Sequence, residues 1–317
     1  MAIRNVVPMN PEISIIGHRG ATGLFPEQTI AGFAKALELG VDGLEMDLAI
    51  TADRKVVAYH DAALNPVITR DSDRMWLDDR VCKISELTLE QLKTYDIGRI
   101  KPGSEYANRF PDQKPVDGSR IPTLEEIVDL DRKFGRNPTY FIEIKYYAVA
   151  PYSSIPVAEG VETIVAEIER LGISSTVRIH SFDWKLVHAF RSFAPHLQYA
   201  YLTSQTEDFN TMSARTELRE VCDDSANPTQ TRSWTDGMLL SDFDGSLPQM
   251  IKSAGGTDWH ADHASVTTDR IAEAHCLGIR VYAWTVNQAS DFERLVDAQI
   301  DGIITDYPDR LIAFLGR

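Results

Sequence analysis

The stretch Gly43-Leu44-Glu45-Met46-Asp47-Leu48 places two acidic residues inside an apolar β-strand pattern. Side chains of a strand alternate between its two faces, so Glu45 and Asp47 point in the same direction. Two neighbouring carboxylates in an apolar setting are unfavourable unless a proton or a cation neutralises them. Hard divalent cations prefer such oxygen ligands. The stretch therefore indicates a metal site at the end of a strand.

Further candidate residues stand on either side of this stretch. In Phe141-Ile142-Glu143-Ile144-Lys145 the alternation returns, so Glu143 and Lys145 share one face of another predicted strand. His18-Arg19-Gly20 lies upstream, and His60-Asp61 lies between the two strands. Arginine matches a phosphate with two parallel hydrogen bonds. A metal-bound anion beside two histidines and an arginine indicates phosphoester chemistry.

Short apolar strands alternate with amphipathic helices along most of the chain, which is the pattern of a parallel α/β fold. In the first predicted helix, about residues 29–39, Ile30, Phe33 and Leu37 follow helical spacing and Gly40 ends the helix. Eight strand–helix units predict an α/β fold of the (β/α)8 TIM barrel type, with its chemistry at the carboxyl ends of the strands. The predicted strands cover residues 13–16, 43–48, 141–144, 177–179, 199–202, 257–260, 281–285 and 302–305.

Sequence signals also predict where several helices begin. Thr123-x-x-Glu126 is a capping box, and Ser290-x-x-Glu293 is read as a second one. Pro308 suits the first turn of the last helix. The strand at residues 257–260 is the least determined element, because residues 237–240 compete with it for the same place.

The alternation of strands and helices breaks after the second strand. Residues from about 51 to 120 contain a short apolar run, a charged Asp/Arg stretch and a Gly/Pro-rich polar segment. This stretch is too long for an ordinary connection. We therefore predict a small inserted subdomain after strand two, within a single barrel domain that spans residues 1–317. Residues from about 203 to 235 form another long polar stretch, which is either a surface loop or a lid over the site.

Composition limits the classes of function. The 317 residues are 43% hydrophobic, enough for a sizeable core, and the formal net charge of −15 argues against nucleic acid or an anionic membrane surface as the main partner. No long apolar run predicts a membrane-spanning helix, and the first residues lack a secretion-type apolar stretch. The three cysteines have neither metal-type spacing nor the even number of a disulfide framework. We expect a cytoplasmic protein, although a removed signal peptide would leave the same sequence; oligomeric state stays open.

Each candidate residue also has a structural alternative. A lone strand-end glutamate usually makes a surface salt bridge, Arg19 could do the same, and His18 could be a core histidine bonded to a backbone carbonyl. His180 ends a strand, and the sequence does not decide whether it belongs to the barrel wall or faces the site. His260 and His263 are assigned to the wall or a loop, because no third metal ligand lies nearby. The joint placement of acids and histidines at the ends of neighbouring strands favours the functional interpretation.

The ordered motifs of the chain resemble those of the glycerophosphodiester phosphodiesterase family, and the resemblance covers nearly the whole sequence. Two positions depart from the family pattern: Gln28 stands where the family usually has Asn, and His180 is more basic than the usual residue there. The motifs are His18-Arg19-Gly20, Pro26-Glu27-Gln28-Thr29, Glu45-Met46-Asp47, His60-Asp61, Ile121-Pro122-Thr123-Leu124-Glu125, Ile142-Glu143-Ile144-Lys145, Ser181-Phe182-Asp183, Ala283-Trp284-Thr285-Val286-Asn287 and the run from Asp301 to Pro308.

The resemblance implies a barrel with a small subdomain inserted after strand two, and roles for eight residues follow from it or from their strand-end positions. Glu45, Asp47 and Glu143 are expected to bind one divalent cation, Mg²⁺ or Ca²⁺. His18 and His60 are expected to be the general acid and base. Arg19 and Lys145 are expected to bind the phosphate, and Trp284 is added to the substrate-binding residues because it ends a later strand.

The leading functional prediction is metal-dependent hydrolysis of a glycerophosphodiester to glycerol 3-phosphate and an alcohol. The first alternative is a phospholipase D-like enzyme acting on lysophospholipids, for which Tyr146, Tyr147, Val149 and Tyr152 could wall an acyl groove. The second is a non-catalytic phosphodiester-binding protein, which both histidines argue against. The sequence leaves open the alcohol group, which histidine is the acid, and whether water or the glycerol hydroxyl attacks.

Overall fold

The computed structural model describes residues 13–78, 82–145, 155–207, 210–212 and 234–317. Eight parallel strands form a closed ring, because the first strand pairs with the second on one side and with the last on the other. The predicted TIM barrel is therefore confirmed. The ring consists of β1 (Ser14–Gly17), β2 (Gly43–Ile50), β4 (Thr139–Ile144), β5 (Val177–Ser181), β6 (Gln198–Thr203), β7 (Asp258–Asp262), β8 (Arg280–Trp284) and β9 (Gly302–Thr305).

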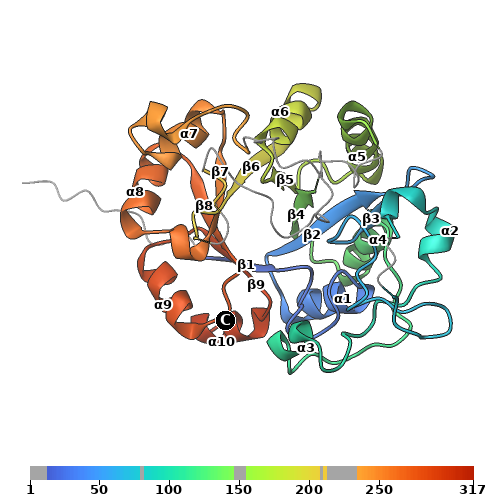
Figure 1. Cartoon of the computed structure of the whole chain (residues 1–317). Helices are drawn as coiled ribbons and strands as arrows, with labels where there is room; N and C mark the ends of the chain where they lie inside the picture. Colours follow the sequence, from blue (N-terminus) through green and yellow to red (C-terminus); the bar gives the residue numbers. More distant parts are fainter. Residues whose placement is uncertain (1–12, 79–81, 146–154, 208–209, 213–233) are drawn as a thin grey trace, which may run out of the picture.

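Helices cover the outside of this ring, and neighbouring helices pack against one another (Figure 1). Within the described residues, none of the helices combines the length and the apolar character needed to cross a bilayer. The covering helices are α1 (Ile30–Leu39), α4 (Leu124–Phe134), α5 (Val157–Leu171), α6 (Trp184–Phe193), α7 (Leu247–Ser253), α8 (Thr268–Cys276), α9 (Ala289–Asp297) and α10 (Pro308–Leu315).

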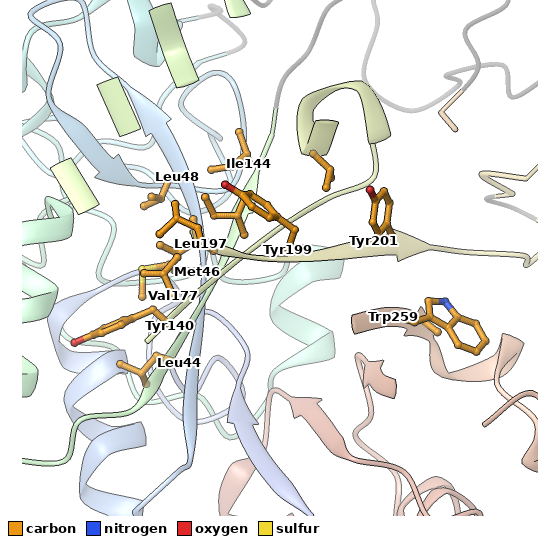
Figure 2. Close-up of a cluster of buried hydrophobic side chains, with 14 of the residues drawn as sticks. Leu44, Met46, Leu48, Tyr140, Ile144, Val177, Leu197, Tyr199, Tyr201 and Trp259 are labelled. Carbon is orange, nitrogen blue, oxygen red and sulfur yellow. The ribbon is translucent and has the colours of Figure 1, made fainter. Parts of the chain in front are cut away.

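Strand β2 shows how the sequence pattern produces the barrel. Leu44, Met46 and Leu48 point outward into the hydrophobic core between the strands and the helices, as Figure 2 shows for them and their neighbours. Each is at most 2% exposed, so their burial supplies favourable apolar contact on the outer face. The alternate residues Glu45 and Asp47 must then face the barrel interior. One strand therefore stabilises the fold with one face and carries acidic groups on the other.

Side chains fill the barrel interior beneath the strand ends. The Arg178 guanidinium contacts the rings of both Phe141 and Tyr282 and forms an ion pair of 3.2 Å with Asp258. Asp258 also accepts a hydrogen bond of 2.6 Å from Arg280. These residues lie near the amino-terminal ends of their strands. A packed interior of this kind leaves only the carboxyl-terminal end of the barrel open for chemistry.

The segment between β2 and β4 departs from the barrel pattern. It contains β3 (Val56–Ala58), which pairs antiparallel with β2 outside the ring, a 3-10 turn η1 (Ile84–Glu86), and the short helices α2 (Leu89–Leu92) and α3 (Glu105–Arg109). Its buried apolar residues form a second cluster, separate from the main core. Figure 1 shows the segment at one side of the barrel, next to β2 and β3. We propose that it forms the small inserted subdomain, and it is called the inserted segment below.

The structure corrects some details of the sequence predictions. The capping box at Thr123 is confirmed, but the one at Ser290 is wrong, because α9 begins at Ala289 and Gln288 is its N-cap without a side-chain hydrogen bond. Of the two segments that competed for one strand, residues 258–262 form β7, whereas residues 240–243 form the 3-10 turn η2 (Leu240–Phe243). Pro308 begins α10 as predicted. Most of the predicted lid or loop at residues 203–235 lies outside the described residues.

Candidate active site

Three carboxylates from two adjacent strands converge at the open end of the barrel. Asp47 on β2 is the direct register partner of Glu143 on β4, and Glu45 lies two residues before Asp47 on the same face. One oxygen from each carboxylate lies within 4.8 Å of the others. Burial, together with the neighbouring charge of Asp47, raises the pKa of Glu45 to about 8. Burial also raises the pKa of Glu143 to about 7.

These three carboxylates fit a hard divalent cation. Three carboxylate oxygens close together supply the oxygen ligands that Mg²⁺ and Ca²⁺ prefer. The raised pKa values of Glu45 and Glu143 show that a nearby positive charge would stabilise the ionised cluster. Within the described residues, no other group of three acidic, histidine or cysteine ligands is close enough to hold a metal ion.

Asp47 lies at the centre of a network of donors. The Lys145 ammonium lies 3.1 Å from Asp47 Oδ1, and Arg19 Nε lies 3.3 Å from Asp47 Oδ2. Burial would raise the pKa of Asp47, but Lys145, His60 and Arg19 outweigh it and lower the pKa. Gln28 Nε2 donates a 2.7 Å hydrogen bond to Asp47 Oδ2. The longer amide at the family's usual Asn position thus reaches the metal-site carboxylate.

Arg19 connects this network to the residues around it. Its backbone N–H donates to Glu45 Oε2 at 2.9 Å, and its guanidinium donates to Glu27 Oε1 at 3.0 Å. Arg19 has a φ of 49°, a left-handed conformation that a non-glycine residue adopts at some cost in strain. Glu27 also accepts a hydrogen bond from the Tyr106 hydroxyl of α3. The inserted segment therefore contacts the predicted phosphate-binding arginine through Glu27.

His18 follows β1 and is oriented by two residues of the β8 and β9 loops. Its Nδ1 lies 2.6 Å from Asp306 Oδ1, and Asp306 Oδ2 accepts a 2.7 Å hydrogen bond from Asn287. His18 Nε2 lies 3.8 Å from Glu45 Oε2, so the free side of the ring faces the acidic cluster. Burial lowers the pKa of His18, but the charge of Asp306 and its hydrogen bond outweigh it, with a further contribution from Glu45, and the pKa is raised.

His60 lies in the inserted segment, just after β3, and has the same kind of support. Its Nδ1 lies 2.7 Å from Asp61 Oδ1, and Asp61 Oδ2 accepts a 2.8 Å hydrogen bond from Asn65. Burial lowers the pKa of His60, and the cations Arg19 and Lys145 lower it further. Although burial would raise it, the pKa of Asp61 is lowered to about 2, mainly through its hydrogen bond with His60.

A cavity of about 310 Å³ opens between the barrel and the inserted segment. Its wall includes His18, Arg19 and Asp306 from the barrel, and His60 with residues of α3 from the inserted segment. The two histidines thus face one space from different parts of the chain. Trp284 ends β8 with its ring against Phe182 at 5.4 Å and is not among the residues of this wall. Its predicted role in substrate binding stays a prediction.

His180 and His260 form a pair that the sequence reasoning did not predict. Both are at most 1% exposed, and their Nδ1 atoms lie 2.6 Å apart. One ring must donate and the other accept, so the two neutral rings have different tautomers. Burial lowers the pKa of His180 to about 3 and that of His260 well below its ordinary value. The pair belongs to the barrel interior, while His263 lies in a separate 3-10 turn, η3 (His263–Ser265).

Comparison with known proteins places this geometry in a family. The model of the glycerophosphoryl diester phosphodiesterase family matches residues 18–310. A curated glycerophosphodiester phosphodiesterase of Caldanaerobacter subterraneus is 28% identical over 303 residues, covering 94% of this chain and 96% of that protein. The crystal structure of a candidate glycerophosphoryl diester phosphodiesterase of Silicibacter pomeroyi is 34% identical, with a TM-score of 0.81, and covers 96% of this chain and 92% of that one.

A more distant structure has the same fold. A phosphodiesterase from Oleispira antarctica, in complex with the product sn-glycerol-3-phosphate, superposes with a TM-score of 0.66 at 18% identity. The superposition covers 97% of this chain and 98% of that protein. At this identity the likeness establishes the shared barrel alone.

Proposed function

Since the chain belongs to the glycerophosphoryl diester phosphodiesterase family and is therefore a hydrolase, we propose that it converts a glycerophosphodiester to glycerol 3-phosphate and an alcohol with one divalent cation. The observation that carries this proposal is the cluster of Glu45, Asp47 and Glu143 within 4.8 Å. The cluster lies next to two histidines that carboxylates orient toward a common cavity. A phosphodiester that enters this cavity would meet cations, an acid and a base.

The acidic cluster and two cationic side chains would bind the phosphate. Glu45, Asp47 and Glu143 would hold Mg²⁺ or Ca²⁺, which when bound would neutralise phosphate charge and stabilise the charge that develops in the transition state. Arg19 and Lys145 lie beside the same carboxylates, at 3.3 Å and 3.1 Å from Asp47. Their positions suit them to contact the remaining phosphate oxygens and to orient the phosphorus atom for attack.

The surroundings of the two histidines favour opposite roles. His60 has a lowered pKa and donates its Nδ1 proton to Asp61, which leaves Nε2 unprotonated and able to take a proton from the attacking oxygen. His18 has a raised pKa and is held by Asp306 at Nδ1, which leaves a proton at Nε2. As the bond from phosphorus to the alcohol oxygen breaks, His18 would give that oxygen its proton. The attacking oxygen belongs either to water or to the glycerol moiety of the substrate.

Removal of the cation tests the proposal. Protein dialysed against a chelator should release no glycerol 3-phosphate from glycerophosphoethanolamine, and added Mg²⁺ or Ca²⁺ should restore the activity. Glu143→Gln keeps the size of the side chain but removes one charge, so this variant should need a higher cation concentration. Calorimetric titration should find one strong cation site in the wild-type protein and a weaker one in the variant. Full activity in excess chelator would contradict the metal requirement.

One observation supports a second candidate class of substrate. A smaller, mainly apolar cavity of about 90 Å³ adjoins His60 and Lys145 and is walled by α5 and α6 side chains such as Val161 and Phe190. It favours a phospholipase D-like activity on lysophospholipids, whose acyl chains need an apolar site. The volume accommodates only a few methylene groups. The residues predicted to wall an acyl groove, Tyr146, Tyr147, Val149 and Tyr152, lie outside the described residues. Choline release from glycerophosphocholine should therefore exceed release from a lysolipid.

A further inference from the structure

Helix α3 of the inserted segment brings three side chains to the wall of the 310 Å³ cavity: Tyr106, Arg109 and Phe110. The helix is fixed to the barrel rim, because the Tyr307 hydroxyl donates to the Arg109 carbonyl at 3.4 Å. A few residues further along, Gln113 Nε2 donates to the Thr22 carbonyl at 2.7 Å. Hydrogen bonds to the barrel therefore hold this part of the inserted segment in place at the cavity wall.

The acidic residues of this cavity wall are already paired with donors from the protein. Each of the three carboxylates accepts hydrogen bonds from two different side chains, so its oxygens are already occupied by donors of the protein. The pairs are Glu27 with Arg19 and Tyr106, Asp61 with His60 and Asn65, and Asp306 with His18 and Asn287.

Arg109 is different. Among the described residues, no carboxylate lies within ion-pair distance of its guanidinium, although the neighbouring arginine of the wall, Arg19, has two such partners. The guanidinium carbon instead lies 5.4 Å from the ring centre of Tyr106 and 5.6 Å from that of Phe110. Such cation–π contacts hold a positive charge in place without neutralising it. They also occupy the aromatic faces that a quaternary ammonium group such as choline would need.

We propose that Arg109 is the centre of an anion subsite that recognises a negatively charged group on the alcohol moiety of the substrate. This inference rests on the proposed function and specifies its substrate class. The glycerol 3-phosphate moiety, common to all these substrates, has the phosphate as its only anion, and Arg19 and Lys145 are placed to bind it. A second anion in the cavity must therefore belong to the alcohol. The planar guanidinium fork matches a carboxylate with two parallel hydrogen bonds.

Two substrates isolate this effect. Glycerophosphoserine and glycerophosphoethanolamine differ by a single carboxylate on the alcohol. The ratio of their kcat/KM values therefore measures how much that carboxylate favours hydrolysis. The wild-type chain should prefer the serine diester. Arg109→Gln should reduce the ratio about tenfold, since a charge-assisted hydrogen bond is lost at a site that water reaches. Arg109→Glu should reverse the preference. Lys101→Gln removes one exposed positive charge from the same segment outside the cavity wall, and it should leave the ratio unchanged.

The outcomes separate this inference from the function on which it rests. Hydrolysis of both diesters with a ratio that Arg109→Gln leaves unchanged would overturn the anion subsite and leave the proposed function intact. An equal fall for both diesters would show that Arg109 binds the shared phosphate, which also overturns the subsite. If Lys101→Gln changed the ratio as much as Arg109→Gln does, the preference would come from the overall charge of the inserted segment. That result would also overturn the subsite. Wild-type protein that hydrolyses neither diester with added Mg²⁺ or Ca²⁺ would overturn the proposed function and the inference together.

Discussion

The barrel and the inserted segment each contribute one histidine in nearly the same local arrangement. On the barrel side, His18 contacts Asp306 at 2.6 Å, and Asp306 accepts from Asn287 at 2.7 Å. In the inserted segment, His60 contacts Asp61 at 2.7 Å, and Asp61 accepts from Asn65 at 2.8 Å. Yet the pKa of His18 is raised and that of His60 is lowered. Hydrogen bonding alone therefore does not set the protonation state of these histidines.

The difference comes from which neighbouring charges prevail at each ring. Both rings are buried, which lowers the pKa of each. At His18 the charge of Asp306 is the largest effect that raises the pKa, and together with the Asp306 hydrogen bond and Glu45 it outweighs burial and Arg19. His60 lies near the cations Arg19 and Lys145, and their repulsion exceeds the attraction of its own aspartate. One site thus contains an acid and a base built from the same residue types, because the charge of Asp306 prevails at His18 and the charges of Arg19 and Lys145 prevail at His60.

The leaving group should distinguish the two histidines with the largest effect. With glycerophosphoethanolamine, His18→Ala and His60→Ala should each reduce kcat about 10²–10⁴-fold, the usual contribution of one proton transfer. A glycerophosphodiester with a p-nitrophenyl group has a leaving group that departs without a proton. On that substrate His18→Ala should recover most of its activity, while His60→Ala should stay low. Steady-state kinetics on both substrates would contradict the assignment if His60→Ala were the variant that recovers.

The aspartates should move opposite limbs of the pH–rate profile. The proposed mechanism requires unprotonated His60 and protonated His18, so kcat/KM should rise with pH through the lowered pKa of His60 and fall through the raised pKa of His18. Asp306→Asn removes the charge that raises the pKa of His18, so the alkaline limb should move to lower pH and narrow the plateau. Asp61→Asn should lower the pKa of His60 further and move the acidic limb to lower pH.

Profiles of the two variants in saturating Mg²⁺, measured with the ethanolamine diester, provide the check. The circular dichroism spectrum of each variant should match that of the wild-type protein, since Asn keeps the size of the side chain. If Asp306→Asn moved the acidic limb, or if Asp61→Asn moved the alkaline limb, the assignment of His18 as the acid and His60 as the base would be contradicted.

The contact between the two regions should have the smallest effect. Tyr106 of α3 donates to Glu27, which in turn binds the Arg19 guanidinium. Tyr106→Phe removes one hydrogen bond, with a net worth of about 0.5–1.5 kcal/mol, so KM should rise about two- to tenfold while kcat changes less. Tyr140→Phe is a matched control, because its hydroxyl also donates to a carboxylate, Asp131 at 2.8 Å, away from the cavity wall. Equal KM values for both variants would show that the inserted segment does not help position Arg19.

Much of the fold was predictable because one strand pattern carries two kinds of information. In β2, the apolar positions fix which face packs against the helices, and the acidic positions must then face inward. The rule that parallel strand ends meet at one rim was enough to bring Glu45, Asp47 and Glu143 together. The register that sets Asp47 opposite Glu143 could not be read from sequence, because it depends on the pairing of strands almost a hundred residues apart.

The supporting residues were less predictable, because their roles depend on closure of the barrel and on irregular chain. Asn287 and Asn65 lie in loops without periodicity, and only the folded chain shows that each holds an aspartate. The pair of His180 and His260 joins β5 and β7, which do not pair with each other but lie on either side of β6, so only the curvature of the folded sheet brings the two rings into contact. The capping box at Ser290 failed for a local reason, since the helix already begins at Ala289 and Ser290 lies inside its first turn.

The central claim is that the two histidines of one cavity hold opposite protonation states near neutral pH. The most direct test is an NMR titration of the imidazole nitrogens in the Mg²⁺-loaded protein, with His18→Gln and His60→Gln to assign the signals. The account predicts that His18 titrates above the ordinary histidine value of about 6.5 and His60 below it. A titration in which the two rings lose their protons together, or in which His60 keeps its proton longer than His18, would contradict it.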